Sequence, residues 1–100
     1  MMRYKISSKA ADDLENIWLF TFENWSLAQA DRYLNLILDE IEYLSINPDA
    51  GKDLSQIRKS YRSSKVKSHI IFYRHSENHQ TIEIIRVLHQ RMDIENRLNE

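Results

Sequence analysis

The chain has 100 residues, 42% of them hydrophobic, a size that allows one small domain over residues 1–100 with a single modest core. One glycine, one proline and no cysteine exclude a linker-rich chain, disulfide bonds, thiol catalysis and cysteine-ligated zinc, and they suit a reducing cytoplasm. The formal net charge is −1, and no apolar run is long enough for a signal core or a membrane span, so we expect neither secretion nor membrane insertion.

Charge is unevenly distributed along the chain. Residues 1–51 hold four Lys/Arg and nine Asp/Glu, residues 52–74 hold seven and one, and residues 75–100 hold three and five. The resulting net charges of −5, +6 and −2 predict one positive face that attracts an anionic partner, although the whole molecule is nearly neutral.

The beginning of the chain predicts a short strand followed by a helix. Polar and apolar side chains alternate over Arg3–Ser7, which is typical of a strand. Ser7 or Ser8 can then N-cap a helix that runs from about Lys9 to Asn24.

This first helix carries more apolar side chains than one buried stripe needs. The inward stripe runs from Leu14 to Trp25 at helical spacing. Leu19, Phe20 and Phe22 fall on other faces. Two interpretations stay open: the helix is buried on two sides, beneath a neighbouring helix and over a sheet, or part of the surplus is a docking surface for another chain.

A second helix follows directly. Ser26 and Gln29 have the spacing of a capping box, and an apolar stripe then continues to about Ile46. The short connection predicts an antiparallel helical hairpin. Leu36 and Tyr43 lie off the stripe, one heptad apart, either as a second docking edge or as ordinary exposed apolar residues.

A proline and the only glycine end the helical part of the chain. We expect Pro48 to stop the helix and Gly51 to adopt a positive φ, with a loop over Lys52–Gln56. The period then changes to that of strands. Ile57–Arg62 is short and polar, as in an edge strand, and Val66–Arg74 alternates between two faces.

The most informative stretch is Thr81–Asp93. Between Ile82 and Leu88, β-branched and aliphatic residues occupy both faces, as in a central strand that is covered on both sides. Glu83 and Arg86 interrupt this strand, one on each face. An arginine in so apolar a strand must find a partner or lie at the rim of the sheet.

Together these elements predict an α+β domain. The polar loop His75–His79 joins the last two strands, so three consecutive strands form an antiparallel meander. The order is β-α-α-β-β-β, with a helical hairpin packed on a small, mostly antiparallel sheet. Arg91–Glu100 predicts a short terminal helix or a mobile tail, and the first strand can join either edge of the sheet.

The residues alone leave the chemistry open. His75 and His79 flank a loop without an evident third ligand, so we expect neither a metal site nor a cofactor. His69, Arg86 and His89 are residue types that can cleave RNA through its own 2′-hydroxyl by acid–base and electrostatic catalysis. The basic strands around them suit an acidic protein partner equally well, or are merely solvated.

Seven short segments, taken in their order along the chain, indicate a family resemblance. They are YKIS at Tyr4–Ser7, AADDLENIW at Ala10–Trp18, WS..QA..Y at Trp25–Tyr33, IEYLSINPDAG at Ile41–Gly51, IRKSYR at Ile57–Arg62, HIIFYR at His69–Arg74 and IEIIRVLHQRMD at Ile82–Asp93. In this order they span roughly nine-tenths of the chain and resemble the ParE branch of the RelE/ParE toxins of bacterial toxin–antitoxin modules, which serve in plasmid maintenance.

The resemblance implies a cytoplasmic toxin that is not itself a catalyst. Such a toxin blocks DNA gyrase while the enzyme holds cleaved DNA, contacts nucleic acid at most through gyrase or the antitoxin, and is silenced in a hetero-oligomer with a cognate antitoxin. The antitoxin would cover surplus apolar side chains, for which the candidates are Trp18, Leu19, Phe22, Trp25, Leu36 and Tyr43. By position, the candidates for contact with gyrase are Arg58, Arg62, Arg86, His89, Arg91 and Met92.

The sister branch supplies the alternative function. RelE-like toxins cut mRNA on the ribosome and commonly carry a basic set on the sheet with a Tyr or His close to the C-terminus. Here no Tyr or His follows His89, which weakens the nuclease interpretation. Its candidates in this chain are His69, Arg86 and His89.

Overall fold

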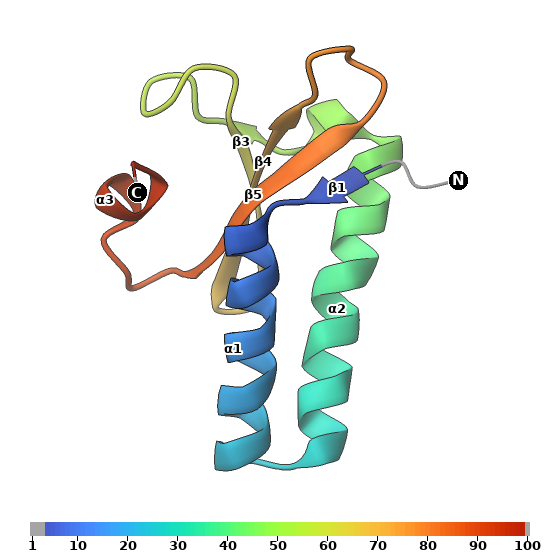
Figure 1. The fold of residues 1–100 in the computed structure, drawn as a ribbon, viewed down its shortest axis with the longest axis vertical. Coiled ribbons are helices and arrows are strands. Elements are labelled where there is room, and N and C mark those ends of the chain that lie inside the picture. The colour runs from blue at the N-terminus through green and yellow to red at the C-terminus, as the bar shows by residue number, and fades with distance from the viewer. Residues whose placement is uncertain (1–3, 100) are drawn as a thin grey trace.

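The computed structural model describes residues 4–99, so Arg3 and Glu100, the outermost residues of two predicted segments, lie outside the described residues. Figure 1 shows a long helical hairpin lying along a twisted sheet and extending past one end of it. The elements in chain order are β1 (Tyr4–Ile6), α1 (Ser8–Asn24), α2 (Leu27–Ile46), the 3₁₀ turn η1 (Pro48–Ala50), β2 (Lys52–Asp53), β3 (Arg62–Val66), β4 (His69–His75), β5 (Ile82–His89) and α3 (Ile94–Leu98).

The sheet has the strand order β1-β5-β4-β3-β2. The β3-β4-β5 meander is antiparallel, β2 continues it on the outer side, and β1 joins the opposite edge in parallel with β5. The predicted α+β class with a mostly antiparallel sheet is therefore confirmed, and the open question about the first strand is settled in favour of the β5 edge.

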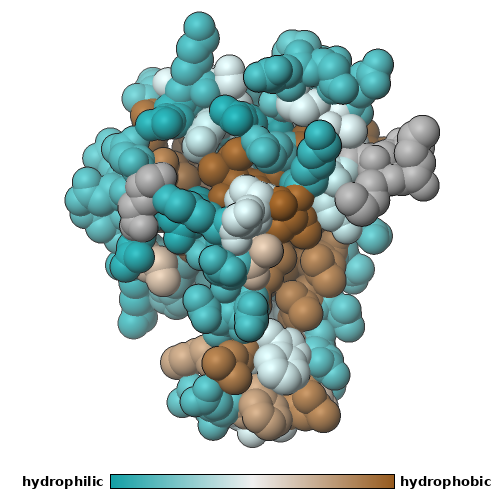
Figure 2. Space-filling model, in the orientation of Figure 1, coloured by the Kyte–Doolittle hydropathy of each residue, from teal (hydrophilic) through white to brown (hydrophobic). Residues whose placement is uncertain are grey.

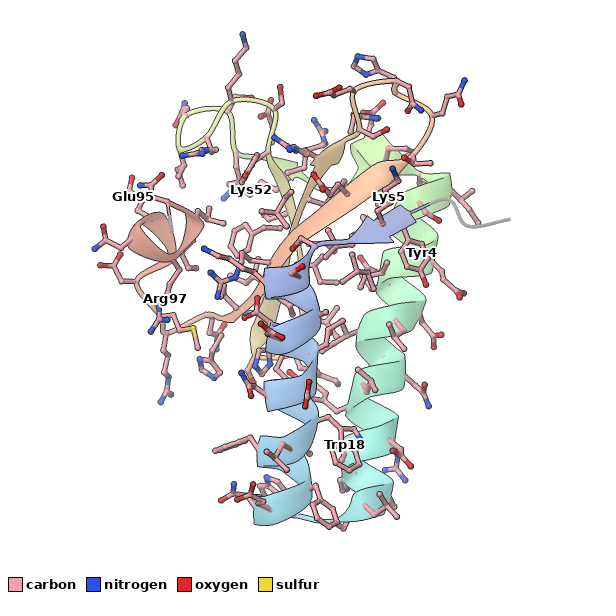
Figure 3. All side chains as sticks on the ribbon, in the orientation of Figure 1. Tyr4, Lys5, Trp18, Lys52, Glu95 and Arg97 are labelled. Atoms are coloured by element: carbon pink, nitrogen blue, oxygen red, sulfur yellow. The ribbon has the colours of Figure 1, made fainter. Side chains whose placement is uncertain are left out.

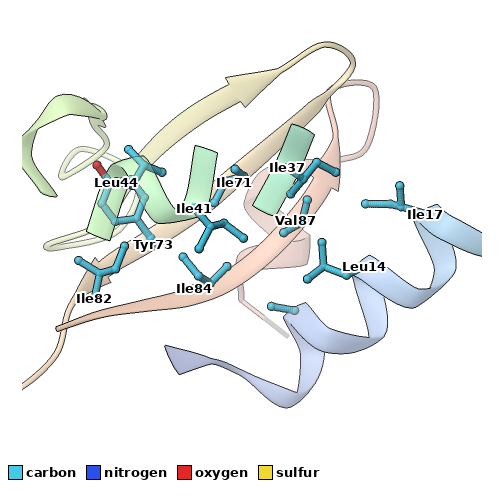
Figure 4. Packing of buried hydrophobic residues seen from close by; sticks show 11 residues of the cluster. Leu14, Ile17, Ile37, Ile41, Leu44, Ile71, Tyr73, Ile82, Ile84 and Val87 are labelled. Carbon is cyan, nitrogen blue, oxygen red and sulfur yellow. The ribbon is translucent and has the colours of Figure 1, made fainter. Parts of the chain in front are cut away.

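Both predicted helix starts are capped by serine. The Ser7 hydroxyl accepts a hydrogen bond from the Ala10 amide at 3.0 Å, and the Ser26 hydroxyl accepts one from the Gln29 amide at 3.1 Å. The hairpin then buries its apolar stripe against one face of the sheet. Figure 4 shows this main core, in which Ile37 and Ile41 meet strand residues such as Ile84.

A smaller core lies on the other face of the sheet, where Phe72 and Leu88 pack with Leu98 of α3. The strand β5 is therefore covered on both sides, as the sequence predicts. A bulge interrupts its pairing with β4, because Phe72 pairs with Arg86 whereas Tyr73 pairs with Ile84.

This bulge corrects one prediction. Glu83 and Arg86 were expected on opposite faces, but they pair with Arg74 and Phe72, which lie two residues apart on β4 and so share a face. The extra residue, Ile85, changes the alternation of β5 and puts both charged residues on the face of the sheet that carries Phe72.

Gly51 is required for a different reason from the expected one. Its φ is −72°, so the predicted positive φ is wrong. A Cβ at this position would lie 2.2 Å from the Tyr73 hydroxyl. That hydroxyl accepts a hydrogen bond from the Gly51 amide at 2.9 Å and donates one to the Pro48 carbonyl at 2.7 Å. Close approach of a buried tyrosine, rather than backbone conformation, explains the glycine.

The polar segment between α2 and β4 differs most from the prediction. Residues 57–61 form turns instead of a strand, and the strand begins only at Arg62. Lys52–Asp53, expected within a loop, pairs with β3 at the sheet edge. The predicted strand Val66–Arg74 begins too early, because Val66 ends β3. A tight turn with Lys67 at a φ of 55° follows, and β4 begins at His69.

Candidate functional site

Arg86 lies at the centre of the site predicted from β5, and its charge is compensated within the chain. Its Nε and Nη2 donate to the two carboxylate oxygens of Asp13 on α1, at 2.8 and 3.0 Å, and its Nη1 donates to the Arg97 carbonyl at 3.2 Å. Both side chains of the ion pair are nearly buried. The bidentate geometry makes this a strong, charge-assisted contact.

Asp13 also completes the edge of the sheet. The strand β1 ends at Ile6, so beyond that point β5 has no strand neighbour on this edge of the sheet. The Ser7 hydroxyl donates to the Ile85 carbonyl at 2.8 Å, and the Val87 amide donates to the Asp13 carboxylate at 2.9 Å. Two side chains thus replace a strand partner. Sequence analysis missed Asp13, because nothing in the pattern links it to a strand more than seventy residues away.

The two histidines of the site form a cross-strand pair. His69 begins β4 and lies directly opposite His89 at the end of β5, with ring centroids 5.2 Å apart in an edge-to-face arrangement. Burial, with a smaller contribution from His89, lowers the pKa of His69 to about 4, although Asp13 acts in the opposite direction. At neutral pH the His69 ring is therefore uncharged.

Hydrogen bonds hold both rings in place. The Nδ1 of His69 lies 2.6 Å from the Tyr33 hydroxyl, whose own pKa is raised by burial. The Nδ1 of His89 accepts a hydrogen bond from the Arg91 amide at 3.1 Å, which holds the orientation of the ring.

One pocket brings the three nuclease candidates together. It has a volume of about 520 Å³, is walled by Ile17 and Phe20 of α1, and includes His69, Arg86 and His89. Acid–base catalysis needs its catalytic side chains to converge on one site, as these three do. Two of the three groups, however, contribute no net positive charge at neutral pH, because Arg86 is neutralised by Asp13 and His69 is uncharged.

The predicted gyrase-facing residues fall into separate groups. Arg86, His89 and Met92 line the pocket, and the exposed Arg91 lies between the last two in sequence. Arg58 donates to Asn99 at 2.7 Å. Arg62 lies at the other end of the strands, where its Nη2 donates to the Asp49 carbonyl at 3.0 Å and its Nε is buried without a hydrogen-bond partner.

The predicted antitoxin-facing residues lie on the helical hairpin, and most are exposed. Of the apolar residues on α1, Phe20 and Phe22 are 65% and 45% exposed, and Trp25 at its end is 75% exposed. The interpretation in which this surplus is buried on two sides is therefore wrong for these residues. Figure 2 shows apolar side chains gathered at the free end of the hairpin. The other large apolar residues of the hairpin that are exposed are Leu19, Leu27, Leu36, Tyr43 and Ile46.

A shallow apolar groove runs between the two helices. It has a volume of about 450 Å³, and the aliphatic side chains that line it include Leu14, Leu34 and Leu38. Trp18 also lines it and lies between the helices in Figure 3. Its indole Nε1 donates to Asp31 at 2.9 Å, and its ring stacks on Phe22 at 5.3 Å. Sequence analysis missed the leucines of the groove, because their spacing assigns them to the core stripe.

Neither a metal site nor a membrane span is found in the part of the chain that the structure describes. Within residues 4–99, no three His, Cys, Asp or Glu side chains are placed to hold a metal ion. The rings of His75 and His79 lie 5.8 Å apart, and His75 Nε2 lies 3.6 Å from an Asp49 oxygen. No helix in this range is long and apolar enough to cross a membrane.

The chain is similar to ParE toxins over nearly its whole length. The family model for the ParE toxin of the type II toxin–antitoxin system parDE matches residues 4–94. Toxin ParE1 of Mycobacterium tuberculosis is 40% identical over 96 residues, which covers 96% of this chain and 97% of the relative. Toxin ParE1 of Caulobacter vibrioides is 36% identical over 93 residues, with coverages of 93% and 94%.

Two solved structures share the fold. A chain of the chromosomal ParDE toxin–antitoxin system of P. aeruginosa superposes with a TM-score of 0.74 at 22% identity, covering 89% of this chain and 96% of that one. A chain of the RelBE2 toxin–antitoxin complex of Mycobacterium tuberculosis superposes with a TM-score of 0.66 at 23% identity, with coverages of 86% and 94%.

Proposed function

Because this chain belongs to the ParE toxin family of type II toxin–antitoxin systems, we propose that it inhibits DNA gyrase and is neutralised by a cognate antitoxin. The observation that carries the antitoxin half of the proposal is the uncovered apolar surface of the hairpin, with its groove and its exposed free end. Monomeric proteins rarely leave a continuous surface of this kind exposed without a partner. We place the toxin in the cytoplasm, in a hetero-oligomer with the antitoxin.

The negative charge of the hairpin predicts a positively charged segment in the antitoxin. Residues 8–46 hold two Lys/Arg and eight Asp/Glu, a net charge of −6. An amphipathic segment with apolar anchors and flanking cations would complement this surface. The proposed contact residues are those predicted from the sequence: Trp18, Leu19, Phe22, Trp25, Leu36 and Tyr43.

The proposed contact with gyrase centres on the pocket beside the exit of β5. His89 and Met92 line it with an imidazole and an apolar side chain, and the exposed Arg91 between them in sequence adds a cation. Arg86 acts behind them as a buried support, and Arg58 and Arg62 are peripheral members of the patch. The toxin inhibits by binding and breaks no bond itself.

Compensated charges in the pocket support this non-catalytic proposal. Cleavage of RNA needs cations for the developing phosphorane charge and an acid–base pair that titrates near neutral pH. The ion pair between Arg86 and Asp13 and the low pKa of His69 work against both requirements.

One pair of assays tests the proposal. Purified toxin, freed from its antitoxin, is added to gyrase with relaxed plasmid and ATP, and separately to translating ribosomes whose mRNA is mapped by primer extension. We expect supercoiling to stop while the mRNA stays intact. Cut mRNA with normal supercoiling would refute the gyrase proposal.

The RelE-type ribosome-dependent nuclease is the alternative, and the convergence of His69, Arg86 and His89 on one pocket favours it. The variant His89→Gln separates the two functions, because a nuclease that relied on this imidazole would lose cleavage by orders of magnitude. A gyrase inhibitor would lose at most part of one contact. The readout is the rate of mRNA cleavage beside the concentration needed for half inhibition of supercoiling.

A further inference from the structure

A second apolar depression lies on the sheet face away from the hairpin. It is a crevice of about 410 Å³ between α3 and the β2–β3 end of the sheet. Phe72, which is buried, and the half-buried Ile70 form its floor, and Leu54, Ile57 and Ile94 form its walls. Ile57 is 45% exposed, so the crevice is open to solvent and extends the smaller core outwards.

Lysines border this crevice. Lys52 and Lys65 line it, and both are exposed. Lys65 pairs directly with Ile70 across β3 and β4, so its cation stands beside the apolar floor. Among the described residues that line the crevice, Glu95 on α3 is the only one with a carboxylate; Figure 3 labels Glu95 and Lys52 on this side of the molecule. Residues 52–74, which supply most of the crevice, carry a net charge of +6.

The crevice and the hairpin groove therefore favour partners of opposite charge. Within residues 4–99, Glu15 is the only charged side chain that lines the groove, and the hairpin around it has a net charge of −6. Both surfaces offer aliphatic side chains, so burial of apolar area favours binding at either one. The sign of the surrounding charge then decides which segment binds where.

We propose that the crevice binds an acidic segment of a protein partner, with bulky apolar side chains entering it and flanking carboxylates meeting Lys52 and Lys65. The aliphatic lining favours a protein segment over single-stranded RNA. Nucleobases are held by stacking on accessible aromatic rings, whereas Phe72, the one aromatic side chain among the described residues of the lining, is buried in the floor of the crevice. This proposal goes beyond the toxin function, since it needs neither gyrase nor the hairpin groove.

A peptide titration with the full-length chain tests the proposal. The probe is a fluorescein-labelled nine-residue peptide with a central leucine-serine-phenylalanine and three glutamates on each side. We expect saturable binding by fluorescence anisotropy, and amide chemical-shift changes that cluster around Ile57, Lys65 and Ile70 in a spectrum of the ¹⁵N-labelled chain. Two control peptides replace the glutamates by lysines, or the leucine and phenylalanine by serines; both should bind at least ten-fold more weakly.

Charge-reversal variants locate the site. Lys52→Glu with Lys65→Glu should raise the Kd of the acidic peptide at least ten-fold, because both attractive cations become repulsive. The matched control, Lys9→Glu with Arg32→Glu, makes the same change of net charge on exposed residues of the hairpin and should change the Kd less than two-fold. All four positions are exposed, so circular dichroism should show intact folds.

The apolar half of the site has its own pair of variants. Ile57→Ser should weaken binding several-fold, whereas Ile46→Ser, an exposed isoleucine at the end of α2, should not. The proposal is overturned if the acidic peptide does not bind, if the lysine peptide binds equally well, or if the hairpin control is as damaging as the crevice variant. Displacement of the peptide by a nine-nucleotide single-stranded RNA at equal concentration would also overturn it, in favour of a nucleic-acid site.

Discussion

Arg86 and the apolar surplus of the hairpin both depart from the usual division between an apolar interior and a polar surface, and the fold treats them in opposite ways. Arg86 is only 8% exposed and is satisfied inside the chain by Asp13 and the Arg97 carbonyl. Phe20, Phe22 and Trp25 remain largely exposed. A departure that is compensated internally concerns stability, whereas one left uncompensated points to a partner.

The difference changes which residues carry the functional argument. In the sequence, Arg86 with two histidines has the composition of a catalytic group, and the surplus on α1 has the composition of a core. In the structure the arginine holds α1 and α3 on β5, and the aromatic side chains face solvent.

The contrast between Arg86 and the exposed hairpin residues depends most on Asp13, the internal partner of Arg86. The variant Asp13→Ala leaves a nearly buried guanidinium without its carboxylate and the Val87 amide without its acceptor. We expect a loss of about 3 to 5 kcal/mol in the free energy of unfolding, measured by urea titration. The double variant Asp13→Leu with Arg86→Met should recover most of this loss, since replacing both partners leaves no unpaired charge. A loss below about 1 kcal/mol for Asp13→Ala would show that the ion pair is not the internal support described here.

The burial of His69 predicts that the free energy of unfolding depends on pH. Its pKa is about 4 in the folded chain and near the ordinary 6.5 in the unfolded chain. Between about pH 6.5 and pH 4 the unfolded chain therefore binds a proton that the folded chain does not, so stability is fully present above this window and falls as the pH falls through it. We expect this residue to account for a loss on the order of 3 kcal/mol.

The variant His69→Gln isolates the contribution of this residue, because carboxylates titrate equally in both proteins. Urea titrations of wild type and variant at pH 7.5 and pH 4 should show a smaller decline for the variant. Equal declines would mean that the ring is protonated in the folded state.

Gly51→Ala tests a second internally compensated position. The added methyl group would overlap the Tyr73 hydroxyl, and Tyr73 is fully buried. We expect a loss of about 1 to 3 kcal/mol in the free energy of unfolding, measured by urea titration. Adding Tyr73→Phe removes the nearest clashing atom, so the double variant should be more stable than the sum of the two single losses predicts. Strict additivity would exclude the clash with the Tyr73 hydroxyl as the cause.

The sequence predicts the fold better than it predicts the site, for physical reasons. Helical periodicity, serine caps and a β-branched strand are local signals, so both long helices and the antiparallel order of the meander are predicted correctly, whereas the first strand of the meander is misplaced. The bulge at Ile85 and the approach of Tyr73 to Gly51 depend on contacts between distant segments. The segment 57–61 has strand-like composition but lies beyond the end of β2, where turns satisfy its backbone instead. The partners of Arg86 are likewise long-range, and no pattern within β5 indicates them.

The smallest effect on stability is expected where the effect on binding is largest. Phe22→Ser and Trp25→Ser remove exposed side chains at the free end of the hairpin, so each should change the free energy of unfolding by no more than about 0.5 kcal/mol. If the antitoxin covers this surface, each should weaken its binding by about 2 kcal/mol, roughly thirty-fold in Kd, by isothermal titration calorimetry. Met92→Ser is the matched control, because Met92 is 42% exposed but lines the pocket at the exit of β5. It should leave antitoxin affinity unchanged and reduce gyrase inhibition. Unchanged antitoxin affinity in the stable Phe22 and Trp25 variants would mean that exposure of these aromatic side chains does not mark the antitoxin site. Uncompensated exposed residues would then no longer indicate where a partner binds.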